Sequence, residues 1–568
     1  MAISRRTFQS AGQISQHSIP GAYSRIDSVK GSSGLVSSSN GVIMGQSTGG
    51  QPAVLLAFGS APEAINVLKG GPLLEAVNLA FNGSADGLVP STVYAMRVDS
   101  ALQSSLDLKD GGSNNQIKLT SLDYGLAQNQ INVVITAGTT AGKKVTITYQ
   151  SDVETFDNVA QTSLTITHAS ATVTVTNNAT THNMVLSVGP ITIDFGTYKT
   201  IADVATFINN QSGYSAVVTA GQENAPSTQL DGVSAQSLVG GYAATSSMYA
   251  IVNTINAQSQ LVSAVAENGA TTITVPANLA TTYLTSGTDG TYTSTEWTAA
   301  LLVLEAEDLQ FISTPDSTQS VQLSIAAHCA SMNSVTNRKE RQFLVGGTWG
   351  DTTSTAKTNA AALNSKYGLY VFNGVQQYNV SGVLTNFDAS YVSAILLGIA
   401  CASAINAPLT FKNLNVVALE QKLTNTQLDD LIVNGVCPMS YSPGGVARVV
   451  RQVNTYQTDD LKWNEFSMVR EMFFISRDLR NNLESMFVGQ AGYNVASGVI
   501  GGAVKGKLAQ YAQLGLFVAD SSGMSWWNVI VNIAGDTVYI DFDANLTAPV
   551  NFLFVTEHFH ELVTQAAA

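Results

Sequence analysis

Glycines and lysines near the C-terminus stand at the spacing of a phosphate-binding loop. The segment Gly501-Gly502-Ala503-Val504-Lys505-Gly506-Lys507 supplies the glycine and lysine positions of that motif. Leu508 follows where the motif requires a serine or threonine, whose hydroxyl holds magnesium. We therefore interpret the glycines as the entry to a helix over residues 504–516 and predict no nucleotide site.

Two histidines near the end of the chain are the main metal-binding candidates. His558 and His560 lie two residues apart, so on a strand they would share a face and clip a metal ion with Glu557 or Glu561 beside them. A solvated segment explains the same pattern more simply. We predict no metal site.

The remaining reactive side chains indicate packing. His328 falls seven residues after Val321 on one helical face, which favours a packed histidine. The carboxylates Glu305, Glu307 and Asp308 have the pattern of a solvated turn. The three cysteines stand far apart in apolar contexts and are predicted to be buried thiols: Cys329, Cys401 and Cys437. No H-E-x-x-H or G-x-G-x-x-G motif occurs, so we predict a non-enzymatic protein with no catalytic residue and no cofactor.

Composition indicates a folded chain with a neutral surface. Hydrophobic residues make up 45% of the 568 positions, which is enough for several buried cores. Charged residues make up only 12%, against roughly 25% in average soluble domains. Large interfaces between subunits would explain this shortage, because a buried charge requires a partner. A Ser/Thr-rich β surface explains it equally well.

Net charge and hydropathy exclude several classes of partner. The net charge of −14 disfavours attraction to phosphates, so no direct contact with nucleic acid is predicted. The segment Ser4-Arg5-Arg6-Thr7-Phe8 is not followed by the apolar core of an export signal. The longest apolar run, residues 391–407, is interrupted by polar residues and followed by Pro408, which predicts a buried helix and no membrane insertion.

An inserted β-rich domain is predicted over residues 99–235. No arginine occurs between Arg97 and Arg338, which sets this part of the chain apart. Alternating apolar and polar residues predict half-buried strands at 144–149, 163–167 and 171–176, with one short helix at 201–209. Residues 236–290 are predicted to return to the small α/β domain that residues 25–98 begin.

An α/β core is predicted over residues 291–547. Strands at 309–312, 342–345 and 368–373 alternate with helices at 296–305, 317–332 and 352–364, which favours partly parallel pairing. The small domain contains a strand at 53–58, two helices within 64–81 and a returning strand at 93–98. The predicted fold class is α/β (α+β) multidomain.

A helix predicted over residues 466–487 has a charged face. Its apolar stripe contains Val469, Met472, Phe473, Leu479, Leu483 and Met486. The opposite face carries Arg470, Arg477, Arg480 and Glu484. This face is either solvated, with Arg480 and Glu484 paired at four residues' spacing, or it docks onto an acidic partner.

Both ends of the chain are predicted to be strand connectors. Residues 538–543 and 550–555 are strand-like, and no later element covers them. The N-terminus is polar and compatible with a strand. We predict that residues 1–24 and 548–568 are arms, and that strands at both ends add to sheets of neighbouring copies through Ile14, Ile19, Tyr23, Val538, Ile540, Phe542, Val550, Phe552 and Phe554.

Several segments together resemble the tail sheath proteins of contractile-tailed bacteriophages. Pro20-Gly21-Ala22-Tyr23 is similar to the N-terminal entry of that family. Residues 57–59, 68–73 and 93–98 resemble its first α/β unit, and residues 285–290 followed by 297–305 resemble the opening of its core. The two C-terminal strands on either side of Pro549 complete a likeness that covers residues 15–98 and 285–558.

The resemblance implies a structural subunit of a myovirus-type tail. Members of this family stack as six-subunit rings around a tail tube on a baseplate, and they contract to drive the tube through the host envelope for genome delivery. Their terminal extensions complete sheets in adjacent subunits. The implied partners are further copies of the chain, the tail tube protein, and baseplate and tail terminator proteins. The implied location is the virion tail, assembled in the host cytoplasm.

For a subunit of this kind, the charged residues of two helices and the neutral insert suggest which faces point toward the tube and outward. The candidates for the face toward the tube are Arg470, Arg477, Arg480, Lys505 and Lys507. The arginine-free insert is expected to point outward.

Two alternatives stay open. A tailocin or a secretion-type contractile device would use the same kind of subunit, and genomic neighbours would distinguish them. The Ser/Thr-rich insert alternatively suggests a polysaccharide-binding or depolymerising surface protein.

Overall fold

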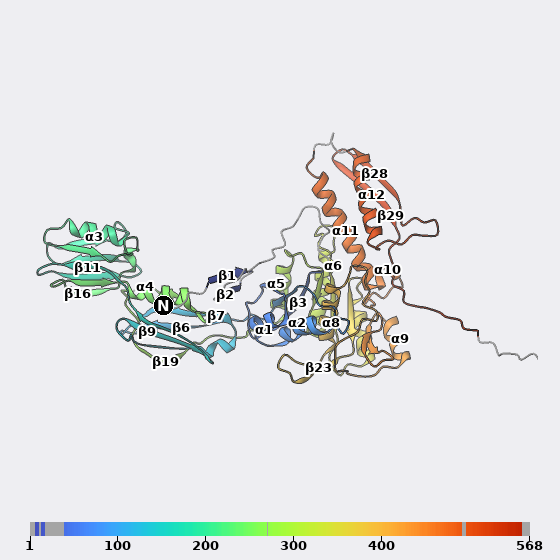
Figure 1. Cartoon of the computed structure of the whole chain (residues 1–568), viewed down its shortest axis with the longest axis horizontal. Coiled ribbons are helices and arrows are strands. Elements are labelled where there is room, and N and C mark those ends of the chain that lie inside the picture. The colour runs from blue at the N-terminus through green and yellow to red at the C-terminus, as the bar shows by residue number, and fades with distance from the viewer. Residues whose placement is uncertain are drawn as a thin grey trace, which may run out of the picture. The chain divides into compact units, whose positions relative to one another are not determined.

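The chain forms two compact units. The computed structural model (Figure 1) describes residues 39–267, 269, 271–490 and 496–558, together with the backbone of strands β1 (Arg6–Ser10) and β2 (Gln13–His17). Unit 1 comprises Met1–Ser47, Ala53–Val98 and Tyr292–Ala568, and unit 2 comprises Thr48–Pro52 and Asp99–Thr291. Helices and several separate sheets occur in both units, which confirms the predicted mixed α/β, multidomain class.

Unit 1 is built on one eight-stranded sheet. Its order is β27-β26-β22-β21-β20-β3-β5-β4. The strands from β26 to β5 run parallel, and the edge strands β27 and β4 are antiparallel to their neighbours. The strands are β3 (Gly41–Gly45), β4 (Leu55–Phe58), β5 (Val93–Arg97), β20 (Phe311–Ser313), β21 (Gln342–Gly346), β22 (Gly368–Phe372), β26 (Cys437–Tyr441) and β27 (Ala447–Val449).

Helices cover both faces of this sheet, so its central strands are apolar on both sides. One face packs against α1 (Ala61–Leu68), α2 (Pro72–Asn82) and α8 (Ala389–Ala402). The other packs against α5 (Ser294–Leu304), α6 (Gln319–Met332), α7 (Thr353–Leu363) and α9 (Asn425–Val433). Helix α8 is the buried helix predicted from the longest apolar run. Among the described residues, no helix has the length and apolarity needed to cross a membrane.

Unit 1 also contains a second, small sheet, and its C-terminal part consists of helices and a hairpin. A small antiparallel sheet has the order β24-β23-β25, from β23 (Val375–Tyr378), β24 (Leu384–Phe387) and β25 (Ala418–Leu419). Helices α10 (Leu461–Asn464), α11 (Phe466–Phe487) and α12 (Ser497–Gln513) precede a hairpin of β28 (Trp526–Ala534) and β29 (Thr537–Ala544).

Unit 2 contains two β bodies with separate cores. The first body surrounds α4 (Ser247–Gln258) with the sheets β18-β7-β6 and β10-β9-β8-β19. Its other elements are β6 (Gln103–Lys109), β7 (Asn115–Tyr124), η1 (Leu126–Gln130), β8 (Asn132–Ala137), β9 (Lys143–Tyr149), β10 (Asp152–Val159), β18 (Val262–Ala266) and β19 (Leu279–Tyr283).

The second β body packs α3 (Ile201–Asn209) against the sheets β15-β11-β17 and β14-β13-β12-β16. Thr200 and Asp203 form a capping box at the start of α3. This local sequence signal explains why so short a helix could be predicted. The remaining elements are β11 (Thr162–Thr167), β12 (Thr172–Asn177), β13 (His182–Leu186), β14 (Ile191–Asp194), β15 (Ser215–Val218), η2 (Ser227–Gln229), β16 (Val233–Ser237) and β17 (Tyr242–Thr245).

Two domain boundaries differ from the sequence-based prediction. Residues 39–98 do not form a small domain of their own, because β3 pairs with β20 inside the large sheet, with Val42 opposite Ile312. Residues 236–290 do not return to such a domain either. They belong to unit 2, because β18 pairs with β7 and α4 lies in the same core.

The inserted stretch begins and ends at one place. Ser100 N donates to the Thr291 carbonyl at 2.9 Å, and Leu102 N donates to the Thr288 carbonyl at 2.9 Å. The first and last residues of the insertion are therefore hydrogen-bonded neighbours.

Candidate functional site

The hairpin of β28 and β29 is a two-stranded sheet with unpaired outer edges. Gly535, with a φ of 66°, and Asp536 form the tight turn. Val531 and Ile540 are opposite each other and pack with Val504 of α12. Neither outer edge has a strand partner among the described residues. Unpaired edges of this kind are templates for an added strand.

An apolar groove of about 550 Å³ runs beside β29. Helix α11 supplies most of one wall, including Ile475, Leu479 and Leu483. Phe542 and Ala544 of β29 line the other wall. A strand added at this edge would therefore have an apolar surface beside it as well as free backbone groups.

The segment after the hairpin exposes its apolar side chains. Thr547 is the last residue tied to the α12 end, through its hydroxyl and the Gly515 carbonyl at 2.8 Å. Beyond it, residues 548–558 contain no helix or strand, so the predicted strand at 550–555 is wrong for the isolated chain. The physical reason is that a strand needs a hydrogen-bonding partner. The exposed fractions are 87% for Val550, 66% for Phe552, 84% for Leu553, 92% for Phe554 and 69% for Val555.

One polar cluster holds the start of this segment, which we call the tail (residues 548–558). Asn551 Nδ2 donates to Glu465 Oε1 at 2.9 Å. Arg451 donates to the same oxygen from Nε at 2.9 Å and pairs with it through Nη2 at 2.8 Å. The Arg451 guanidinium also lies 5.5 Å from the centre of the Phe552 ring. We call Arg451, Glu465, Asn551 and Phe552 the tail clip.

The predicted terminal-arm residues have different outcomes. Val538 and Ile540 lie in β29 and pair with Ile533 and Val531 of the same chain, so one edge of this strand is paired internally. The addition of a neighbour's strand at its other edge stays a prediction. Ile14 lies in β2, opposite Gln9 of β1. Ile19 and Tyr23 lie outside the described residues.

Arg470 is buried, contrary to the predicted exposed face. Its guanidinium lies at the C-terminal end of α8, where it donates to the Ser403 carbonyl at 2.9 Å and to the Ala404 carbonyl at 3.2 Å. Carbonyls at a helix C-terminus lack intrahelical partners and carry partial negative charge, so a guanidinium is favourable there. Burial lowers the pKa of Arg470 to about 10.

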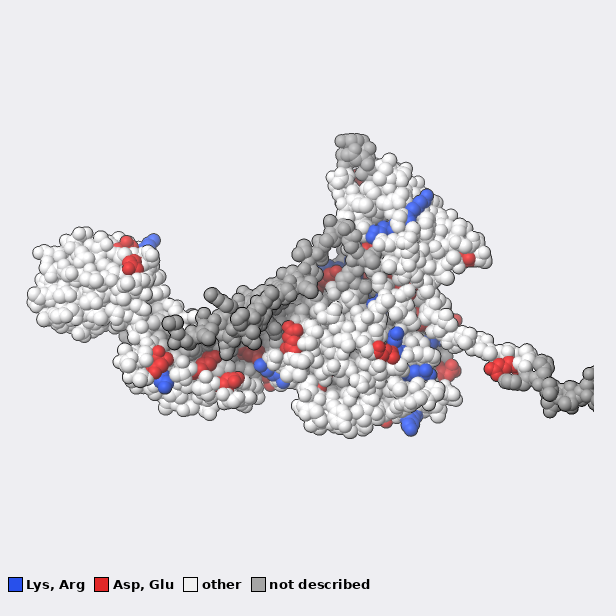
Figure 2. All heavy atoms as spheres, in the orientation of Figure 1, with Lys and Arg blue, Asp and Glu red and all other residues white. Residues whose placement is uncertain are grey.

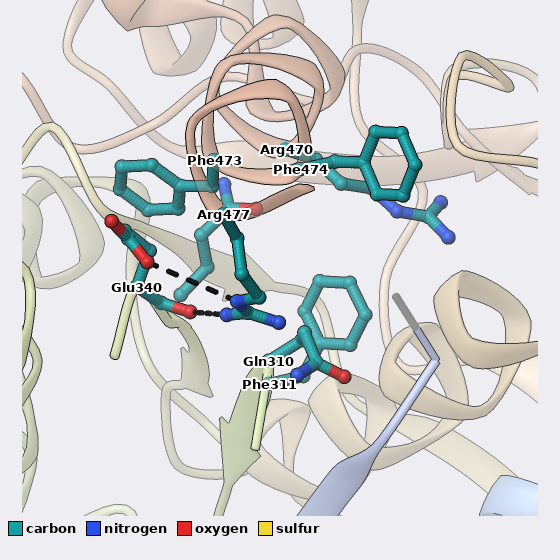
Figure 3. A pocket seen from close by; sticks show the side chains of 8 residues that line it. Gln310, Phe311, Glu340, Arg470, Phe473, Phe474 and Arg477 are labelled. Atoms are coloured by element: carbon teal, nitrogen blue, oxygen red, sulfur yellow. Dashed lines mark hydrogen bonds and ion pairs between the residues drawn. The ribbon is translucent and has the colours of Figure 1, made fainter. Parts of the chain in front are cut away.

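Arg477 is also buried and joins α11 to the body. It points from the helix toward Glu340, whose backbone carbonyl accepts its Nη2 hydrogen bond (Figure 3). Its Nη1 lies 3.6 Å from the Asp308 carboxylate. The cavity lined by Arg470, Arg477 and the rings of Phe473 and Phe474 measures only about 20 Å³. It is therefore a packing gap and not a ligand site.

Arg480 binds the same acidic residue. Both its Nη atoms donate to the Glu340 carboxylate, at 2.6 and 2.8 Å, in the bidentate geometry that arginine favours. Burial raises the pKa of Glu340, but the bonds from Arg480 outweigh that effect and leave the pKa below its ordinary value. Glu484 pairs with Arg338 and not with Arg480 as predicted.

The two lysines of α12 differ in their surroundings. Lys507 Nζ lies 3.0 Å from the buried Asp478 of α11, which also accepts a bond from Tyr511 at 2.7 Å. Lys507 therefore joins the two helices. Lys505 is exposed and forms no ion pair with any described residue. The glycine-rich segment lies inside α12 itself, so it forms no phosphate-binding loop.

The other residues considered for catalysis or metal binding are a buried histidine, three buried cysteines and a histidine outside the described residues. His328 is buried with Nε2 3.0 Å from Arg341 Nη1, as predicted, and burial lowers its pKa to about 4. The three cysteines are buried and unpaired, as predicted. His560 lies outside the described residues. Within the described ranges, no three His, Cys, Asp or Glu side chains gather in a way that suits a metal.

A hydrolase-like pattern follows β3. Gly45-Gln46-Ser47-Thr48-Gly49 matches G-x-S-x-G, which in a nucleophile elbow joins a strand directly to a helix. Here the next helix begins only at Ala61, after β4. Ser47 is 4% exposed, and a Cβ at Gly71 would lie 3.0 Å from its Cα. The pattern is therefore a packed turn.

Sequence comparisons point to one family. Residues 290–455 match the model of the phage tail sheath protein central domain. The chain is 25% identical to the tail sheath protein of Bacillus phage SP01 over 576 residues, covering 95% of each protein. It is 24% identical to the tail sheath protein of Staphylococcus phage Twort over 529 residues, covering 85% of this chain and 87% of that protein.

Solved structures show the same fold. The sheath tail protein of Desulfitobacterium hafniense superposes with a TM-score of 0.56 at 14% identity, covering 93% of this chain and 96% of that one. The sheath tail protein of Listeria innocua gives a TM-score of 0.50 at 13% identity, covering 86% and 88%. The family model and the curated relatives confirm the family resemblance predicted from sequence.

Proposed function

We propose that this contractile phage tail sheath protein is the repeating subunit of the sheath, assembled as stacked six-subunit rings around a tail tube. Contraction of that sheath drives the tube through the host envelope. The observation that carries the proposal is the unpaired edge of β29 beside an apolar groove, in a chain that also exposes an apolar tail. Edge, groove and tail have complementary chemistry, because the edge offers backbone bonds and the groove accepts apolar side chains.

The tail of a second copy is the occupant we propose for this edge. The chain's own tail is held on the body by the tail clip, since Asn551 is bonded to the buried Glu465. Its exposed residues Val550, Phe552 and Phe554 are then directed to another subunit. A contact between different surfaces of successive copies gives an open helical stack when its rotation does not close into a ring.

Strand addition suits a sheath that changes length. Each backbone hydrogen bond contributes only about 0.5 to 1.5 kcal/mol net, but a strand makes several and every subunit repeats them. We propose that the paired arms persist during contraction, while polar contacts between bodies are exchanged for more extensive ones.

Of the five residues predicted to face the tube, we keep one as a candidate. Arg470, Arg477, Arg480 and Lys507 are engaged by groups of the same chain. Lys505 is exposed on α12, and we propose that it faces an acidic surface of the tube protein.

Electron microscopy of the purified chain tests the proposal. The full chain is expected to form striated hollow tubes. Variants lacking residues 548–568 or residues 1–20 should stay folded by circular dichroism but form no long tubes. Normal tubes from either deletion would contradict the arm assignment for that end.

A related contractile device is the second candidate. A tailocin or secretion-type sheath would form the same tubes, and genes for a capsid beside this one would favour the phage. Monomers or trimers that cleave polysaccharide would instead favour a surface depolymerase.

A further inference from the structure

A polar cleft of about 500 Å³ lies between the two β bodies of unit 2. One wall is β10 with the residues that follow it, the second is α4, and the third is formed by η2 and the turn before it. The volume falls within the roughly 300–1,000 Å³ of known ligand pockets. Six side-chain amides line the cleft, which we call the amide cleft: Asn158, Gln161, Gln222, Gln229, Asn253 and Gln258.

Buried hydrogen bonds hold the walls of the amide cleft together. The Asp231 carboxylate, beside η2, accepts bonds from Ser247 N at 2.7 Å and Met248 N at 3.1 Å, at the start of α4. Gln161 N donates to Ser247 Oγ at 3.1 Å. Because these bonds join all three walls, the cleft is preformed, and a ligand would lose little affinity to ordering it.

The lining of the amide cleft is uncharged except at one residue. Its single charged residue is Asp157, whose carboxylate already accepts hydrogen bonds from Thr139 N at 3.0 Å and Asn158 N at 2.8 Å. No lysine, arginine, histidine or cysteine lines the cleft. Phosphate groups and metal ions therefore find no complementary charge or ligand set. Neutral areas also dominate the protein face shown in Figure 2.

Three of the amides are available to a ligand. The side chains of Gln229, Asn253 and Gln258 form no hydrogen bond with other described residues. An amide offers donors and an acceptor side by side, which matches the hydroxyl groups of a sugar, each both donor and acceptor.

We propose that the amide cleft binds a neutral oligosaccharide. The amides of Asn253 and Gln258 hydrogen-bond its hydroxyl groups. This function is additional to sheath assembly, because the cleft lies entirely within unit 2.

Titration calorimetry on the full-length, unassembled chain tests the proposal. The probes are maltotetraose, cellotetraose, chitotetraose and mannotetraose, with tetragalacturonate as the charged counterpart. At least one neutral tetrasaccharide should bind, more tightly than tetragalacturonate. The double variant Asn253→Ala, Gln258→Ala should weaken that binding about tenfold or more, since two hydrogen bonds are lost.

The control is Gln236→Ala, which removes an exposed amide of β16 outside the cleft and should bind as the unaltered chain does. Absence of binding by all four neutral probes, or unchanged binding by the double variant, would overturn the proposal. Neither result bears on tube formation, so the sheath assignment is tested separately.

Discussion

Asn551 donates a hydrogen bond of 2.9 Å to Glu465, a carboxylate with no solvent exposure. Arg451 neutralises the same carboxylate through the same oxygen, Oε1, at 2.8 Å. The buried pair thus gives the exposed tail a fixed starting point on the body. That relationship leads to the first prediction.

Asn551→Ala should release the tail without unfolding the body. One hydrogen bond to a buried charge is lost, which costs about 1.5 to 3 kcal/mol at most. A spin label at position 553 should become more mobile, and tubes should become shorter. The control is Asn545→Ala, whose side chain lies outside the tail clip. Equal label mobility in both variants would show that the tail clip does not hold the tail.

Arg470→Met should destabilise unit 1 strongly. The variant leaves the Ser403 carbonyl at the end of α8 without its hydrogen-bond donor, whereas the Ala404 carbonyl keeps its bond from Ala407 N at 3.0 Å. Leaving a buried acceptor without its donor typically costs about 1 to 3 kcal/mol. Lys505→Ala, on the exposed side of α12, should stay within about 0.5 kcal/mol of the unaltered chain. Urea unfolding compares the two, and equal stabilities would restore the exposed face predicted for Arg470.

Glu471→Gln should flatten the dependence of stability on pH. Burial raises the pKa of Glu471 from 4.5 to about 8, although Arg470 opposes the shift. In the folded chain the carboxyl keeps its proton while the unfolded chain loses it, so stability is full below pH 4.5 and falls as pH rises to about 8. The slope is at most about 1.4 kcal/mol per pH unit.

Urea unfolding at about pH 5.5, 6.5 and 7.5 measures this slope. The glutamine side chain cannot ionise, so the stability of this variant should fall less steeply as the pH rises. Glu557→Gln, an exposed carboxylate in the tail, should behave as the unaltered chain does. Parallel curves for all three proteins would rule out Glu471 as the source.

Leu483→Lys should block tube formation while leaving the fold intact. Leu483 lines the groove beside β29, and a lysine there can lift its ammonium into solvent but obstructs an apolar occupant. Leu514→Lys is the matched control, because Leu514 is 41% exposed at the end of α12 and outside the groove. Electron microscopy should show tubes for the control alone. Tubes from both variants would remove the groove from the assembly model.

Helices with strong local signals were predictable from sequence. The predicted bounds 466–487 and 201–209 are those of α11 and α3. In α11 a sustained apolar stripe marks the helix, and in α3 a capping box marks its start. Both signals lie within a few residues of each other along the chain.

The arginine environment was not predictable in the same way. Periodicity identifies one apolar face of α11, but the helix packs against the body on one side and α12 on another, so its charged face is also covered. The partners of Arg470 and Arg477, Ser403 and Glu340, lie 67 and 137 residues away in sequence. The pairing of β3 with β20 has the same long-range character, which hid the single large sheet.

The tail shows a limit of a different kind. Residues 550–555 are mostly apolar and were predicted to form a strand, but the hydrogen-bonding partner that would make a strand is not in the described chain. The sequence can indicate that a segment is able to form a strand, whereas the strand forms only when the edge of another strand is available to it.

The hydrogen-bonded neighbours Ser100 and Thr291 place the two junctions of residues 99–291 side by side, and the short loop Thr48–Pro52 completes unit 2. Because the two junctions lie side by side, a short linker would span the gap left by excision at little entropic cost. A foreign domain whose own ends lie close together could be grafted at the same point. One sheath scaffold can in this way carry very different decorations, by natural exchange or by engineering.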